Sequence, residues 1–126
     1  MNLIVKPRSE TPIYEQLYDQ IVANIVGEEI LAHQCLPSIR LVARELDISV
    51  VPVKAAYDLL EKNGYIYTLP GKGCFVAQVE THLKKTDLAL EKMQECVNFC
   101  KETGMNCEEF LNLAQKCFQK NDVSGK

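Results

Sequence analysis

Apolar residues recur at helical spacing near the start of the chain. They follow Thr11 and Pro12, an N-cap residue and a proline at the first helical position, which together are typical of a helix start. The apolar stripe consists of Ile13, Leu17, Ile21 and Ile25. This spacing predicts an amphipathic helix that ends near Gly27 and packs one face into a core.

Two shorter helical patterns follow, separated by only a few residues. Ser38 predicts the N-cap of the first, and Ser49 predicts the N-cap of the second, which ends near Gly64. Each has one apolar face and one polar face. Two short helices this close together predict a helix-turn-helix, in which the second helix is the recognition helix.

The helical spacing of apolar residues ends at Gly64. Residues 65–68 and 74–76 are β-prone, and the turn-rich residues 69–73 between them suit a hairpin. Three helices followed by a hairpin make a winged helix. The sequence therefore predicts a winged helix-turn-helix domain over residues 1–79.

Helical spacing returns from Thr81 to the end of the chain. Apolar residues spaced by seven form a short heptad-like seam that Gly104 ends, and Asn106 with Glu109 resembles a capping box for a last helix. We expect residues 80–126 to form a two-helix dimerisation element, because these helices present more apolar surface than one small domain covers. The predicted dimer contacts are Leu83, Leu90, Met93, Val97, Phe110 and Leu113. The predicted fold class is therefore mainly α (α+β).

Composition limits the classes of partner. The 126 residues carry a formal net charge of −3, and acidic residues slightly outnumber basic residues on both sides of Val79. Any contact with nucleic acid must therefore come from a few well-placed cations. The chain shows no secretory signal and no apolar run of about 18 residues, so we expect a cytoplasmic protein with no membrane partner.

Six cysteines raise the question of thiol or metal chemistry. Cys96 and Cys100 lie one helical turn apart, but the chain has no CxxC pair and no close Cys/His cluster. We interpret the cysteines as free, small apolar packing residues and expect no metal and no cofactor. His33 and His82 have no nucleophile beside them in a known motif, so we expect no catalytic residues and no enzyme activity.

Four blocks of sequence, in order, point to one family. Residues 12–17 (PIYEQL), 36–40 (LPSIR), 56–66 (AYDLLEKNGYI) and 71–76 (GKGCFV) together resemble the GntR family of bacterial repressors. The short two-helix tail is similar to the YtrA-like branch of that family. This resemblance implies a homodimer that binds double-stranded DNA at an inverted-repeat operator.

The resemblance also implies which residues contact DNA. Arg40 matches an arginine that contacts the backbone or a base edge, Ser49 and Lys54 match positions of the recognition helix, and Gly71 with Lys72 matches the wing tip. This chain departs from the family where an arginine often follows the cap serine, because Val50 and Val51 stand there. Exposed valines at that point suit thymine methyl groups or a readout of DNA shape. The predicted DNA-binding residues are Ser38, Arg40, Ser49, Val50, Val51, Lys54, Gly71 and Lys72.

The resulting hypothesis is a sequence-specific, dimeric transcription repressor. The resemblance implies control of a neighbouring transporter operon or of its own operon, and an unidentified small-molecule effector would bind at the dimer interface or beside the tail. Two alternatives stay open at this point. One is a thiol- or ligand-responsive sensor, and the other is a winged-helix adaptor that binds a second protein.

Overall fold

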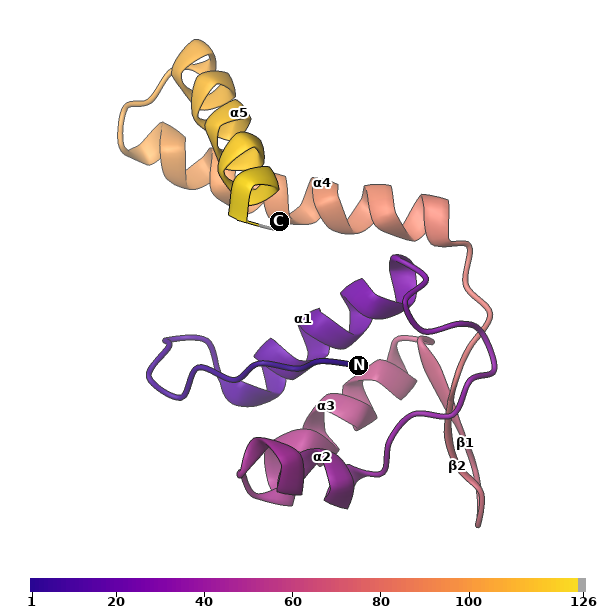
Figure 1. The fold of residues 1–126 in the computed structure, drawn as a ribbon. Helices are drawn as coiled ribbons and strands as arrows, with labels where there is room; N and C mark the ends of the chain where they lie inside the picture. Colours follow the sequence, from indigo (N-terminus) through magenta and orange to yellow (C-terminus); the bar gives the residue numbers. More distant parts are fainter. Residues whose placement is uncertain (125–126) are drawn as a thin grey trace. The chain divides into compact units, whose positions relative to one another are not determined.

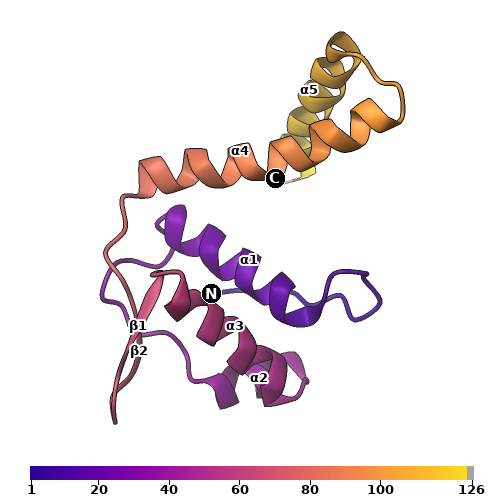
Figure 2. The ribbon, with the colours of Figure 1, turned by 180° about the vertical axis from the view of Figure 1, so that it is seen from behind.

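The computed structural model describes the backbone of residues 1–124 and the side chains of residues 1–80 and 84–120. The chain divides into two compact units, Met1–Lys85 and Thr86–Lys126, which we treat separately. Figure 1 shows the helices and strands in chain order, and Figure 2 shows the same ribbon from behind. Among the described residues, no helix combines the length and apolar character needed to span a lipid bilayer.

The first unit begins with three helices. They are α1 (Ile13–Val26), α2 (Ile39–Leu46) and α3 (Val50–Lys62). The helix α3 packs against both α1 and α2. The predicted stripes supply the core, because Leu17 and Ile21 of α1 and Val53 and Leu60 of α3 are fully buried. Burial of these side chains stabilises the unit by roughly 1.5–3 kcal/mol each relative to exposed side chains.

The ends of these helices differ in part from the sequence-based expectation. The N-cap of α1 is Pro12, not Thr11, because proline has extended backbone angles and its carbonyl accepts the first N–H groups of the helix. The N-cap of α2 is Ser38, as predicted. Ser49 holds the N-cap position of α3, but its side chain makes no capping hydrogen bond. Gly64, after the end of α3, has a φ of +82°, which suits glycine.

A two-stranded antiparallel hairpin completes the winged helix. The strands β1 (Ile66–Leu69) and β2 (Gly73–Val76) pair with Ile66 opposite Val76 and Leu69 opposite Gly73. Ile66 and Val76 are both buried, so the base of the hairpin joins the helical core. The predicted winged helix-turn-helix is confirmed.

Two helices follow the wing. The helix α4 (Thr81–Glu102) begins at the end of the first unit and continues into the second, where α5 (Cys107–Ser124) follows it. Gly104, two residues after the end of α4, has a φ of +85°. The mainly α fold with two C-terminal helices is confirmed, whereas the domain boundary between residues 79 and 80 stays a prediction.

Candidate nucleic-acid interface

The start of α2 is held by two hydrogen bonds. The Ser38 Oγ accepts the backbone N–H of Leu41 at 3.1 Å, which satisfies one of the free N–H groups of the helix start. The Tyr57 hydroxyl of α3 donates to the carbonyl oxygen of Pro37 at 2.7 Å. These bonds fix the backbone directly before Arg40, whose side chain is exposed.

The role of Tyr57 in placing α2 was not expected from the sequence. Its side chain is only 3% exposed. Burial raises the pKa of the Tyr57 hydroxyl well above its ordinary value, and the nearby thiols of Cys74 and Cys35 raise it further. The hydroxyl therefore stays protonated and keeps donating its hydrogen bond throughout the physiological pH range. A buried tyrosine whose hydroxyl needs a partner was the available signal.

The first turn of α3 presents apolar surface to solvent. Val50 is 46% exposed and Val51 is 70% exposed, and Ser49 before them is exposed as well. Val53 in the same turn is fully buried, so the exposed valines are the outward face of a well-packed helix. The two valines that are predicted to contact DNA in place of an arginine are therefore both open to solvent.

Lys54 is exposed one turn further along α3, but its charge has a partner. Its Nζ lies 2.8 Å from the Asp58 carboxylate, and the hydrogen bond and charge of Asp58 raise the pKa of Lys54. This pairing offsets the positive charge that a phosphate would attract. This ion pair was not expected from the sequence, although a spacing of four residues on a helix signals such a pair.

The wing tip turns at Gly71 and Lys72. Gly71 has a φ of +77°, a value that favours glycine, and the N–H of Lys72 donates to the carbonyl oxygen of Leu69 at 2.9 Å. Both residues are exposed. The Lys72 ammonium therefore lies at the tip of a well-formed hairpin.

The segment before α2 lies beside the wing. Cys35 forms an antiparallel bridge with Phe75, and the Leu36 N–H donates to the carbonyl oxygen of Cys74 at 2.8 Å. The His33 Nδ1 also lies 2.8 Å from the Tyr67 hydroxyl. The wing and the start of α2 are thereby joined by backbone pairing. In Figures 1 and 2 the wing tip and the α2–α3 turn lie on the same, lower side of this unit.

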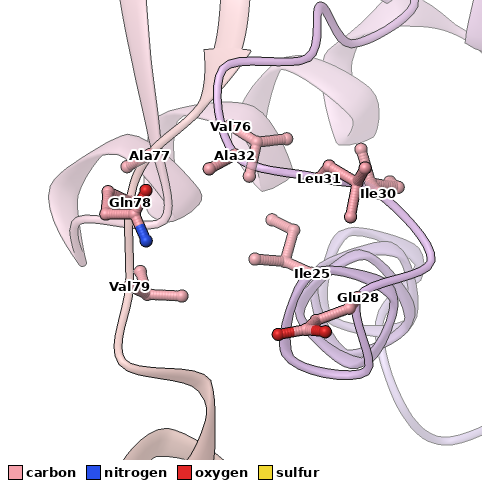
Figure 3. Close-up of a pocket in the computed structure, with 9 residues that line it drawn as sticks. All are labelled: Ile25, Glu28, Ile30, Leu31, Ala32, Val76, Ala77, Gln78 and Val79. Carbon is pink, nitrogen blue, oxygen red and sulfur yellow. The ribbon is translucent and has the colours of Figure 1, made fainter.

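A small cavity lies on the first unit, between the end of α1 and the segment after β2 (Figure 3). Its volume is about 220 Å³. It is lined by Ile25, Glu28, Ile30, Leu31, Ala32, Val76, Ala77, Gln78 and Val79. This volume lies below the roughly 300–1,000 Å³ of typical small-molecule sites.

The predicted dimer contacts fall into two groups. Leu90, Met93 and Leu113 are between 45% and 63% exposed. Val97 and Phe110 are half-buried and line a cavity of about 200 Å³ near the connection between α4 and α5. The side chain of Leu83 lies outside the described residues. Further large apolar side chains that were not predicted are exposed in the same unit, namely Phe99, Leu111 and Phe118.

The winged domain matches a known protein family. The family model described as bacterial regulatory proteins, gntR family, matches residues 13–76. The chain belongs to the GntR family. Residues 13–76 span all three helices and the wing, so the family match covers every residue proposed to contact DNA.

Two regulators of Bacillus subtilis (strain 168) extend the similarity beyond the GntR domain. The chain is 32% identical over 106 residues to the uncharacterized HTH-type transcriptional regulator YhcF, covering 82% of this chain and 88% of YhcF. It is 33% identical over 91 residues to the HTH-type transcriptional repressor YtrA, covering 71% of this chain and 70% of YtrA. The chain is thus a YtrA-like member of the GntR family.

Solved structures agree with this assignment. A transcriptional antiterminator from Listeria monocytogenes EGD-e matches with a TM-score of 0.76 and 29% identity, covering 95% of this chain and 92% of that one. The AraR DNA-binding domain in complex with operator ORX1 matches with a TM-score of 0.53 and 30% identity, covering 60% of this chain and 93% of the AraR chain. This GntR-family chain is a DNA-binding transcription regulator.

Proposed function

We propose that the protein is a homodimeric repressor that binds an inverted-repeat operator. The observation that carries this proposal is the combination of a GntR winged helix with an exposed apolar surface on α4 and α5. YtrA, which resembles the chain over 91 residues, is a transcriptional repressor. The regulated genes would be a neighbouring transporter operon or the protein's own operon.

The proposed DNA contacts come from three places in the first unit. Ser38 and Arg40 approach the backbone or a base edge at the start of α2. The tip residues Gly71 and Lys72 lie along the minor groove. The start of α3 enters the major groove with Ser49, Val50, Val51 and Lys54. This arrangement is supported by the exposure of all eight residues and by the AraR domain, a structural relative bound to an operator.

The dimer is proposed to form through the apolar surface of α4 and α5. Exposed leucine, methionine and phenylalanine side chains on both helices form more apolar surface than isolated side chains of a monomer would. A two-fold dimer would bury this surface and present two winged domains to an inverted repeat. The residues proposed for the contact are Leu83, Leu90, Met93, Val97, Phe110 and Leu113.

Binding to the upstream DNA of its own gene tests the proposed repressor. Fluorescence anisotropy at physiological salt is expected to give tighter binding to that duplex than to a scrambled duplex. Arg40→Ala is expected to weaken binding by about 1–3 kcal/mol without a change in the thermal melt. Lys62→Ala removes an equal charge at the exposed far end of α3 and serves as the matched control. Equal affinity for both duplexes would refute sequence-specific binding.

Sedimentation tests the dimer separately. Leu90→Glu is expected to shift the protein toward the monomer, because a charge at this position opposes burial in an apolar contact. Ala89→Glu introduces the same charge at the adjacent exposed position and is expected to leave the dimer largely intact. A Leu90→Glu protein that sediments as the wild type would place the contact elsewhere.

An effector, if the repressor has one, is proposed to bind at the dimer interface or beside the tail. The two cavities described above are each near 200 Å³, below the size of typical small-molecule sites. A dimer interface formed by two copies of α4 and α5 would supply a larger site. Thermal shift measurements with candidate metabolites, repeated on Leu90→Glu, test whether binding depends on the dimer.

A further inference from the structure

Sulfur atoms gather around the connection between α4 and α5. Cys96 and Cys100 lie four residues apart on α4, so their side chains project from the same face of the helix. Cys100 is buried and Cys96 is exposed. Cys100, Met105 and Cys107 line the cavity of about 200 Å³ at this connection. A soft-ligand cluster, defined as Cys96, Cys100 and Met105, thus lies within the second unit.

A C-terminal cap closes α4 directly after Cys100. The N–H of Met105 donates to the carbonyl oxygen of Cys100 at 3.0 Å, and the N–H of Gly104 donates to that of Lys101 at 3.1 Å. With the left-handed Gly104, these bonds form a Schellman motif, in which the residues at the positions of Met105 and Cys100 commonly contact each other. Met105 and Cys100 also line the same cavity.

The start of α5 has its own cap. The N–H of Asn106 donates to the Glu109 carboxylate at 3.1 Å, and the N–H of Glu109 donates to the Asn106 side-chain oxygen at 2.9 Å. This is the capping box that the sequence predicts, with asparagine as the cap. Asn106 and Phe110 line the same cavity as Cys100 and Met105. The site is built by local hydrogen bonds within one chain.

The two thiols and the thioether of the soft-ligand cluster determine which metal ions they bind well. Thiolate and thioether ligands favour soft ions, of which monovalent copper accepts a low coordination number. Among the described residues, no group of three His, Cys, Asp or Glu side chains is placed to hold a metal ion, so a four-ligand zinc site does not form there. We propose that Cys96 and Cys100 bind one monovalent copper ion as thiolates, with Met105 as a third, thioether ligand.

Charge and proton balance are consistent with this site. Two thiols each release a proton to solvent, and the copper ion with two thiolates carries one negative charge, which lies beside Lys101 on the cavity wall. Because both thiols release their protons on binding, the apparent copper affinity rises with pH, by up to about 100-fold per pH unit while both protons are displaced.

The test uses the reduced full-length protein under anaerobic conditions and without DNA, so its outcome is independent of the operator proposal. Monovalent copper is supplied as its coloured bicinchoninate complex, and loss of colour reports transfer to the protein. The expected result is one copper ion per chain. Cys96→Ser is expected to lower the affinity by at least tenfold, and Met105→Leu by a smaller factor.

Cys117→Ser removes an exposed thiol of α5 outside the soft-ligand cluster and serves as the matched control. It is expected to bind copper as the wild type does. Because Cys96 is exposed, its replacement by serine leaves the fold intact, and circular dichroism checks this. The proposal is overturned if the wild type takes no copper from bicinchoninate, or if the Cys96 and Cys117 variants lose copper equally.

Discussion

The hydroxyl of Tyr57 offers the sharpest test of how α3 places α2. Tyr57→Phe removes the 2.7 Å hydrogen bond to the Pro37 carbonyl and leaves the rest of a buried side chain unchanged. A lost hydrogen bond costs about 0.5–1.5 kcal/mol, and a partly buried carbonyl without its partner adds to this cost. We therefore expect the free energy of unfolding to fall by about 1.5 kcal/mol. This change lowers the Tm of a unit of this size by roughly 6–12 °C.

Thermal unfolding followed by circular dichroism measures this loss. Tyr14→Phe is the matched control, because it removes the same hydroxyl from an exposed tyrosine of α1 and is expected to change stability by no more than about 0.5 kcal/mol. Operator affinity of Tyr57→Phe is also expected to fall, because the backbone before Arg40 loses a support. If Tyr57→Phe and Tyr14→Phe have the same Tm, the hydrogen bond to Pro37 does not hold α2 in place.

Alkaline pH supplies a second readout of the same bond. The pKa of Tyr57 is raised in the folded protein above its ordinary value of 10.0. For a group whose folded pKa is raised, the stabilisation is fully present below the unfolded pKa and is lost as pH rises through it toward the folded pKa. The loss is about 1.4 kcal/mol per pH unit above pH 10. The wild-type advantage over Tyr57→Phe, about 1.5 kcal/mol at neutral pH, is therefore expected to vanish near pH 11. An advantage that is unchanged at that pH would contradict the buried, protonated hydroxyl.

Three further predictions concern the winged domain. Asp58→Asn frees Lys54 from its ion pair and is expected to tighten DNA binding up to about fivefold at low salt, with less effect at high salt, as measured by anisotropy. Ser38→Ala is expected to cost about 1 kcal/mol of stability in urea melts, whereas Ser49→Ala, which loses no capping bond, is expected to cost almost none yet to weaken DNA binding. Leu60→Ala, at a fully buried position, is expected to cost about 2–5 kcal/mol in the same melts.

The fold was predictable because its elements rely on local signals. Apolar residues at helical spacing placed α1, and Ser38 and Gly64 marked the start of α2 and the end of α3. The capping box at Asn106 is visible in the sequence for the same reason, since both partners lie within one turn. The error at Thr11 also has a local cause, because proline serves as well at the N-cap as at the first helical position.

The site was less predictable because its contacts join residues far apart in the chain. Nothing near Pro37 in the sequence indicates that its carbonyl accepts a hydrogen bond from Tyr57, twenty residues away. The bridge between Cys35 and Phe75 depends in the same way on how the segment before α2 packs against the wing. Both contacts act on the start of α2. Spacing along the chain therefore locates the residues proposed to contact DNA but not the bonds that orient them.

Charge placement leads to a specific view of DNA recognition. On α3, Lys54 near the start of the helix is paired with Asp58, and Val50 and Val51 at the helix start are exposed. In the proposed complex, α3 would present apolar contacts and little net charge to the major groove. The positive charge at the proposed contacts would then come from Arg40 and from Lys72 at the wing, which are both exposed. Such a binder neutralises few phosphates, so we expect a shallow dependence of affinity on salt and a strong dependence on thymine methyl groups or DNA shape. A steep salt dependence would instead show that further cations reach the phosphates.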